Sequence, residues 1–169
     1  MKITLVGAMA SGKTTIGKKL SAVLCYPFYD TDQWIESETG MLISQLFAAQ
    51  GEPFFRAHET KALQHFFSHP SEDMVLSTGG GIIKTPKNRH LLSQHSTVIY
   101  LKVSVATQLQ RTEGDTTRPL LMTPDKVGVL TRLQTERTLW YQETATVTID
   151  ADQASPDELV TTILSCIDL

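Results

Sequence analysis

The segment that most strongly indicates the fold lies close to the N-terminus and reads Gly7-Ala8-Met9-Ala10-Ser11-Gly12-Lys13-Thr14. It fits the phosphate-loop pattern G-x-x-x-x-G-K-[ST]. The preceding run, residues 2–6, is short and apolar, as expected of a strand. The following run, residues 15–25, places four apolar side chains on one helical face: Ile16, Leu20, Val23 and Leu24. Strand, loop and helix in this order is the context that the pattern requires. We therefore predict a P-loop that binds a nucleoside triphosphate.

The residue types of this loop suit phosphate groups. Gly7 and Gly12 allow the backbone to turn so that successive N–H groups point into one hollow. The helix that follows adds the positive end of its dipole. Lys13 is placed to put a point charge on the outer phosphates, and the Thr14 hydroxyl to hold Mg²⁺. The alternative is an ordinary strand-turn-helix connection, which the correct flanking segments disfavour.

Composition bounds the class of protein. The chain has 169 residues, 41% of them hydrophobic, which suits one globular domain. Its net charge of −3 indicates no broad basic face for nucleic acid. We expect Cys25 and Cys166, the two cysteines, to be reduced core residues of a cytoplasmic protein. Neither a signal peptide nor an apolar run of membrane-spanning length is apparent, so no membrane association is expected.

Strand-like and helix-like runs alternate along the rest of the chain. Besides 2–6, strands are predicted at 27–30, 74–78, 97–101 and 147–150, and helices at 33–38, 42–50, 52–67, 86–94, 105–111, 125–145 and from Ser155 onward. This alternation predicts an α/β fold with a parallel sheet covered by helices on both faces. Residues 1–169 are expected to form a single domain.

Two carboxylates follow the second predicted strand. Asp30 and Asp32 are separated by one residue. Because the carboxyl ends of parallel strands face the ligand crevice, both are expected near the phosphate loop, in a magnesium or proton-acceptor role. The alternative is a turn in which Asp32 only caps the next helix.

A long helical crossover separates the second and third strands. It exceeds the usual connection in α/β units, so residues 31–68 are expected to be an insertion that covers a second substrate. Within it, Arg56 and Glu59 lie three residues apart and share a helical face. The alternative for this pair is a solvated surface ion pair.

Two later segments complete a candidate acceptor pocket, and a third is a candidate lid. Gly79-Gly80-Gly81 leaves bare backbone at the end of the third strand, which a ligand can approach closely. The polar segment 112–124 is predicted to be a mobile lid whose Arg118 neutralises charge during phosphoryl transfer; the alternative is an ordinary surface loop. Arg137 lies in the late helix, and arginines grip carboxylates through two parallel hydrogen bonds. Such a pocket suits a small acid bearing hydroxyl groups.

These motifs, taken in order, resemble the shikimate kinase family over nearly the whole chain. The resemblance rests on the phosphate loop, Asp30-Thr31-Asp32, Phe55-Arg56 with Glu59, Ser77-Thr78-Gly79-Gly80-Gly81, Arg118-Pro119-Leu120, and Glu136-Arg137 followed by Tyr141-Gln142-Glu143-Thr144-Ala145. It implies a three-layer P-loop kinase fold like that of nucleoside monophosphate kinases, with five parallel strands in the order 2-3-1-4-5. It also implies transfer of the γ-phosphoryl group of ATP to the 3-hydroxyl of shikimate, on the route to chorismate and the aromatic amino acids.

The resemblance implies a role for each matching residue. The ATP-binding residues would be Ala10, Ser11, Gly12, Lys13, Thr14, Thr15, Arg111, Arg118 and Gln153. The acceptor-binding residues would be Asp32, Arg56, Glu59, Gly79, Gly80, Gly81 and Arg137. Mg²⁺ would be held by Thr14 and Asp30, and the catalytic residues would be Lys13, Asp32 as the base, and Arg118.

Two rival functions stay open at this point. A kinase for another hydroxy acid, such as gluconate, would share the phosphate loop but should lack the arginines and glycines of the acceptor pocket. A non-catalytic nucleotide-binding module would not need that pocket. The partners expected are ATP and shikimate, without nucleic acid or membrane, for a chain that acts as a monomer.

Overall fold

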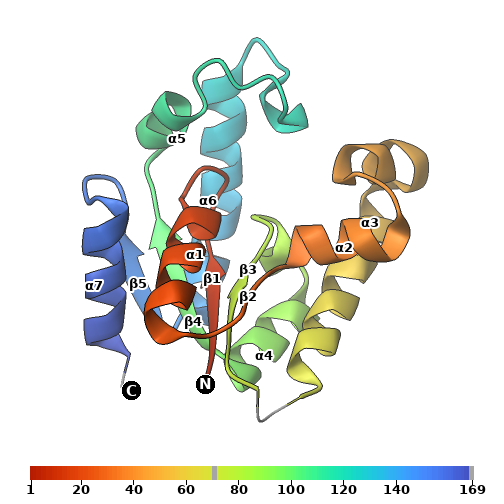
Figure 1. Cartoon of the computed structure of the whole chain (residues 1–169). Helices are drawn as coiled ribbons and strands as arrows, with labels where there is room; N and C mark the ends of the chain where they lie inside the picture. The colour runs from red at the N-terminus through yellow and green to blue at the C-terminus, as the bar shows by residue number, and fades with distance from the viewer. Residues whose placement is uncertain (70–71, 168–169) are drawn as a thin grey trace.

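A sheet of five parallel strands forms the centre of the computed structural model, which describes residues 1–69 and 72–167 (Figure 1). The strand order is β2-β3-β1-β4-β5, which confirms the predicted order. The strands are β1 (Lys2–Val6), β2 (Phe28–Asp30), β3 (Met74–Ser77), β4 (Thr97–Lys102) and β5 (Val147–Asp150). Their carboxyl ends share one edge of the sheet, where the P-loop follows β1.

The helices lie within a few residues of their predicted positions. They are α1 (Lys13–Leu24), α2 (Thr31–Thr39), α3 (Ile43–Phe67), α4 (Pro86–His95), α5 (Val105–Arg111), α6 (Lys126–Thr144) and α7 (Pro156–Cys166). Two short 3₁₀ helices were not predicted from the sequence, η1 (Ile82–Lys84) and η2 (Pro119–Leu121). Both are single turns, too short to produce a periodic pattern.

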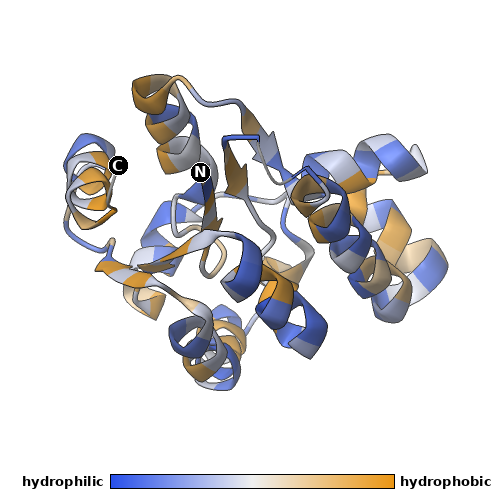
Figure 2. Cartoon of the chain, turned by 90° about the horizontal axis from the view of Figure 1, so that it is seen from below, coloured by the Kyte–Doolittle hydropathy of each residue, from blue (hydrophilic) through white to orange (hydrophobic). Residues whose placement is uncertain are grey.

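Alternating side chains of the strands build one core on each face of the sheet. In β4, Val98 and Tyr100 belong to the core covered by α3, α4 and α6, whereas Ile99 and Leu101 belong to the core covered by α1 and α7. Figure 2 shows hydrophobic residues along the central strands and hydrophilic residues on the outer sides of the helices. This two-sided burial is the reason why the central strands β1, β3 and β4 are almost continuously apolar.

The segment between β2 and β3 consists of α2 and α3, which pack against each other beside the sheet (Figure 1). The two helices predicted for residues 42–67 are both present, and together they make up α3; they are separated by a break at Gly51, whose φ of 80° is not helical. Pro53 follows in the first turn after the break, where its missing N–H costs little. The break turns the first part of α3 away from the part that packs on the sheet.

Two side chains expected in the core, and one expected on the apolar face of α1, are exposed. Val23, near the end of α1, is 59% exposed, because that helix buries only the side that carries Ile16 and Leu20. Cys25 and Cys166 are free thiols at the ends of α1 and α7, and both are exposed. The expectation of buried cysteines was therefore wrong. No helix in the described part of the chain is long and apolar enough to cross a membrane.

Candidate active site

The P-loop takes the conformation that its glycines permit. Gly7 and Gly12 have φ angles of 152° and 93°, in the region that favours glycine. A Cβ atom at Gly7 would lie 2.6 Å from the carbonyl oxygen of Leu101, so a larger residue would displace β4. Helix α1 begins at Lys13, directly after the loop, and its free N–H groups face the hollow.

Lys13 is buried within the loop. Its ammonium donates hydrogen bonds to the carbonyl oxygens of Gly7 (2.8 Å) and Ala8 (2.9 Å) and to the Ser11 hydroxyl (3.3 Å). Burial lowers the pKa of Lys13 to about 8, although Asp32 and Asp30 oppose the change. The cation is therefore held close to the phosphate hollow with few water molecules around it.

The P-loop opens into a cavity of about 500 Å³. Its lining includes most of the residues predicted to bind ATP: Ala10, Gly12, Lys13, Thr14, Thr15, Arg111 and Arg118. Ser11 instead lines an adjoining cavity of about 260 Å³, with Arg111 and Ala154. Gln153 is exposed and lines neither cavity, so its predicted role has no structural support beyond its position next to Ala154.

Arg111 connects the P-loop with the end of β5. Its guanidinium donates to the carbonyl oxygens of Ala10 (3.0 Å) and Ala151 (2.6 Å). It lies at the junction of the two cavities, because its side chain lines both.

Asp30 and Thr14 provide hard oxygen atoms at the mouth of the loop. The Thr14 hydroxyl lies 3.5 Å from Asp30 Oδ2. The other oxygen, Asp30 Oδ1, caps α2 by accepting from the backbone N–H groups of Asp32 (2.9 Å) and Gln33 (3.4 Å). The alternative in which Asp32 caps this helix is therefore wrong, and the Asp32 carboxylate is free for another role. A hydroxyl and a carboxylate at this spacing fit Mg²⁺, which keeps several waters and takes few protein ligands.

A second cavity, of about 190 Å³, adjoins the first, and we call it the acceptor cavity. All the residues predicted to bind the acceptor line it: Asp32, Arg56, Glu59, Gly79, Gly80, Gly81 and Arg137. They come from α2, α3, the turn after β3, and α6. The structure thus brings together residues that lie more than 100 positions apart in the sequence.

The acceptor cavity contains polar atoms that lack partners. Arg56 donates to Glu59 Oε2 at 2.7 Å, and the Glu59 side chain is completely buried, so this pair is not the solvated surface pair considered above. The second Glu59 oxygen, Asp32 Oδ1 and Arg137 Nε are buried without a hydrogen-bond partner. Unpaired buried polar atoms are costly, and here they converge on one cavity. A polar ligand with both donors and acceptors would satisfy them.

Asp32 lies where the two cavities meet, because its side chain lines both. Burial raises the pKa of Asp32 to about 6, with the negative charge of Asp30 adding to the rise. Burial likewise raises the pKa of Glu59 to about 7, against the opposing effect of Arg56. A carboxylate that titrates close to neutral pH is suited to accept a proton.

The glycine run after β3 lies beside these carboxylates in the lining of the acceptor cavity. A Cβ atom at Gly79 would lie 2.9 Å from Asp32 Oδ1 and 3.3 Å from Glu59 Oε1. A Cβ atom at Gly81 would overlap the guanidinium of Arg56. Side chains at these positions would therefore move the charged groups.

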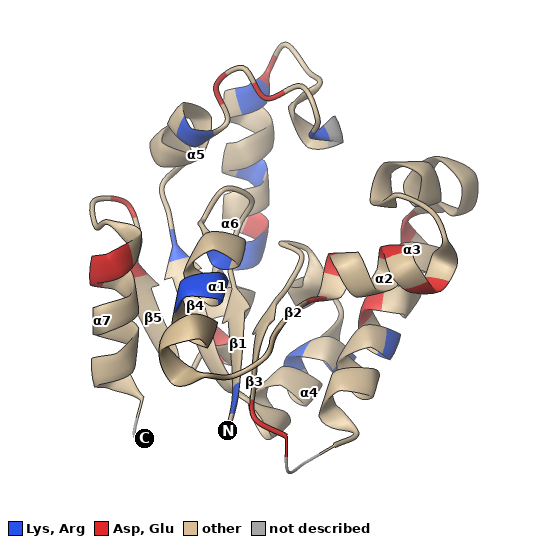
Figure 3. Cartoon of the chain, in the orientation of Figure 1, with Lys and Arg blue, Asp and Glu red and all other residues tan. Residues whose placement is uncertain are grey.

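Arg118, in the predicted lid (112–124), lines the cavity into which the P-loop opens. Arg118 Nε donates to Asp115 Oδ2 at 2.8 Å, and the Arg118 side chain is 42% exposed. Leu120, in the 3₁₀ turn that follows, lines both cavities. Figure 3 shows basic residues on α1 and α5 and acidic residues on α2, whereas α3 and α6 carry residues of both signs.

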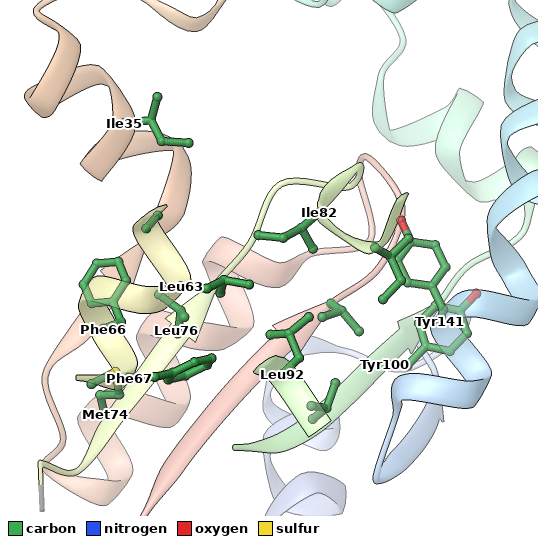
Figure 4. Close-up of a cluster of buried hydrophobic side chains, with 14 of the residues drawn as sticks. Ile35, Leu63, Phe66, Phe67, Met74, Leu76, Ile82, Leu92, Tyr100 and Tyr141 are labelled. Atoms are coloured by element: carbon green, nitrogen blue, oxygen red, sulfur yellow. The ribbon is translucent and has the colours of Figure 1, made fainter. Parts of the chain in front are cut away.

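Several lining residues were not identified from the sequence. Tyr141 is buried in α6, and its hydroxyl donates to the carbonyl oxygen of Gly80. Its ring stacks on Tyr100, with ring centres 4.8 Å apart and planes at 15°, at the edge of the core cluster in Figure 4. Gln108 donates to the P-loop carbonyl of Met9 at 2.9 Å. The sequence carried two signals for Tyr141: it lies four residues after Arg137 in a helix, and it belongs to a motif on which the family resemblance rests.

Apolar side chains complete the acceptor cavity. They are Ile43, Phe47, Phe55, Leu120, Leu130 and Leu133. They come from α3, η2 and α6, and they favour a ligand with a small hydrocarbon frame beneath its polar groups.

Known proteins are similar to this chain in both sequence and fold. The protein-family model described as "Shikimate kinase" matches residues 9–168. A shikimate kinase of Legionella pneumophila (strain Corby) is 41% identical over 162 residues, which cover 96% of this chain and 91% of that relative.

Comparison with solved structures points to the same family. The structure described as shikimate kinase from Acinetobacter baumannii in complex with shikimate has a TM-score of 0.92 and 40% sequence identity, covering 97% of this chain and 90% of that one. A deoxyadenosine kinase from M. mycoides, with a TM-score of 0.62 and 16% identity, shares the fold alone. The match over almost the whole chain, at this identity, shows that the chain belongs to the shikimate kinase family.

Proposed function

We propose that this chain transfers the γ-phosphoryl group of ATP to the 3-hydroxyl of shikimate, giving shikimate 3-phosphate and ADP. One observation carries the proposal: Asp32 lines both the P-loop cavity and the acceptor cavity, and one of its buried oxygens has no partner. An acceptor hydroxyl bonded to this oxygen would point toward the phosphate hollow. Asp32 is the base that accepts the hydroxyl proton as the phosphoryl group is transferred.

The acceptor carboxylate would be held by Arg56 and Arg137. Arg56, in α3, is fixed by the buried Glu59, and Arg137, in α6, keeps an unpaired Nε. The two guanidiniums therefore offer charge-assisted hydrogen bonds to the carboxylate from two different helices. The backbone of Gly79 to Gly81 approaches the ligand without side chains. The apolar side chains from α3 and α6 pack against the ring carbons.

On the ATP side, the loop from Ala10 to Thr15 surrounds the phosphates, and Lys13 exchanges its backbone carbonyl partners for phosphate oxygens. Arg111 lies toward the base. Mg²⁺, held by Thr14 and Asp30, would neutralise negative charge on the phosphate oxygens. Arg118 leaves Asp115 and reaches the phosphates when the lid, 112–124, closes.

We further infer that residues 31–68 act as the substrate-binding insertion and that the chain works as a cytoplasmic monomer. Both cavities are lined by one copy of the chain, which supports a site that needs no second subunit. The net charge of −3 supports small-molecule substrates over nucleic acid.

The test is an ADP-release assay with a panel of hydroxy acids that includes shikimate and gluconate. Shikimate should stimulate ADP release far more than gluconate, and the product should carry one phosphate on the 3-hydroxyl by ³¹P NMR. Preference for gluconate would favour the rival kinase. ATP binding without transfer to any acceptor would favour a non-catalytic module.

A further inference from the structure

A chain of charged side chains runs along the outside of the acceptor cavity. Glu52 Oε1, in α3, accepts from Arg56 Nε at 3.2 Å and from Lys84 Nζ at 2.9 Å. Lys84 also lies 3.8 Å from Glu136 Oε1, in α6. One ammonium from η1 thereby joins the two helices that carry Arg56 and Arg137.

Lys84 does not itself belong to the described residues that line the cavity. It ends the 3₁₀ turn that follows Gly81, and its side chain is 31% exposed. Any influence on the acceptor must therefore pass through the residues that it contacts.

Two carboxylates contact different edges of the Arg56 guanidinium, and they differ in how firmly they are fixed. Glu59 is completely buried and holds one terminal nitrogen at 2.7 Å. Glu52 holds the Nε edge, but its side chain is 47% exposed and can exchange this contact for water. The same Glu52 oxygen is bonded to Lys84, so Lys84 restricts the carboxylate to the position that faces Arg56.

We propose that Lys84 is a positioning residue for acceptor binding, which acts through Glu52 to fix the guanidinium plane of Arg56. This inference rests on the proposed function, in which Arg56 binds the acceptor carboxylate. A planar donor fork binds a carboxylate well only in one orientation, so a freely rotating guanidinium binds it less tightly. The hydrogen bond from Lys84 is also the largest of the effects that lower the pKa of Glu52.

The expected effect is modest, because the Lys84–Glu52 pair is partly exposed to solvent. Lys84→Met keeps the aliphatic stem and removes the charge. It should raise KM for shikimate about two- to fivefold, with kcat and KM for ATP unchanged. The difference from the parent protein should shrink as NaCl is raised, because salt screens an exposed ion pair.

The matched control is Lys87→Met. Lys87 is an exposed lysine three residues later, in α4, and should give the kinetics of the parent protein. Thermal melting of both variants checks that the fold is kept.

The route through Glu52 is tested with a double-mutant cycle. If Lys84 acts through Glu52, Lys84→Met should have no further effect on KM for shikimate in a Glu52→Gln background. An effect that persists in that background, or that disappears instead in a Glu136→Gln background, would overturn the proposed route.

Arg56→Lys separates this inference from the function on which it rests. If Arg56→Lys raises KM for shikimate and Lys84→Met does not, the role of Lys84 is refuted while the arginine clamp stands. If Arg56→Lys also leaves that KM unchanged, the clamp itself is wrong and the role of Lys84 falls with it.

Discussion

Replacing Asp32 with asparagine should make the ligand-free protein more stable and at the same time slow phosphoryl transfer. Burial and the nearby Asp30 raise the pKa of Asp32 from 3.8 to about 6, so the folded protein holds a carboxylate where its charged form is disfavoured. Asparagine has nearly the same shape and carries no charge. The same substitution removes the group that accepts the hydroxyl proton.

The size of the effect follows from this shift. Each pKa unit corresponds to about 1.4 kcal/mol, so ionised Asp32 lowers the free energy of unfolding by at most about 3 kcal/mol. Because the side chain is not completely buried, water reduces this cost, and we expect a gain of about 1–3 kcal/mol for Asp32→Asn. For a chain of this size, each kcal/mol raises the melting temperature by about 2–4 °C.

The gain should depend on pH with a definite sign. A carboxyl group whose pKa is raised by folding stabilises the protein in its protonated form and loses that contribution as pH rises through the folded pKa, here about 6. The parent protein should therefore have a lower free energy of unfolding than Asp32→Asn at pH 8. The two should converge as pH falls toward 4, where Asp32 is protonated in the parent protein.

The assay is thermal or urea unfolding of both proteins at pH 8 and near pH 4–5, beside steady-state kinetics with shikimate. Glu38→Gln is the control, because Glu38 is an exposed carboxylate of the same helix. The control should change stability little at either pH. Equal or lower stability of Asp32→Asn at pH 8, with normal kcat, would refute both the cost of the buried charge and its catalytic role.

The remaining predictions concern the phosphates, the acceptor and the lid. Lys13→Ala should leave a folded protein with turnover almost abolished in the ADP-release assay; near-normal turnover would contradict the role of its ammonium. Arg56→Lys and Arg137→Lys should each raise KM for shikimate roughly ten- to a hundredfold without affecting KM for ATP, since each loses charge-assisted bonds worth about 1.5–3 kcal/mol. If both keep normal shikimate kinetics, the acceptor is another molecule. Tyr141→Phe should lower the free energy of unfolding by about 1–3 kcal/mol, because a glycine-loop carbonyl loses its buried donor; unfolding at the parent's urea midpoint would show that this bond adds nothing. Limited proteolysis between Thr112 and Thr123 should slow when an ATP analogue and shikimate are both bound, and equal rates would count against a closing lid.

The strands and helices were predictable because their signals are local. The apolar runs of β1, β3 and β4 reflect burial on both faces, and the start of α7 follows from the Ser155 cap and Pro156. The strand order came from the family resemblance, since local patterns do not specify which strands pair. The exposure of Val23 was missed because a helical face predicted from spacing does not show where neighbouring elements end.

The candidate site was predictable where a residue type has few other uses. The P-loop glycines, Lys13, and the arginines of the acceptor cavity were identified by motif and resemblance. Gln153 was placed by resemblance alone, and in the structure it is exposed and lines neither of the cavities beside the P-loop. No local pattern in the sequence indicates Lys84, because its partner Glu52 lies 32 residues away.

Local sequence is enough to predict the P-loop, the alternation of strands and helices, and the set of charged residues available for catalysis, because these depend on backbone preferences and side-chain chemistry within short segments. The packing of distant segments determines that Asp30 caps α2 and leaves Asp32 free, and that Asp32 lies between two cavities with a pKa of about 6. It also determines that Arg56 is held by both Glu59 and Glu52. These properties depend on burial and on contacts between segments far apart in the chain, and the packing of the whole domain fixes both.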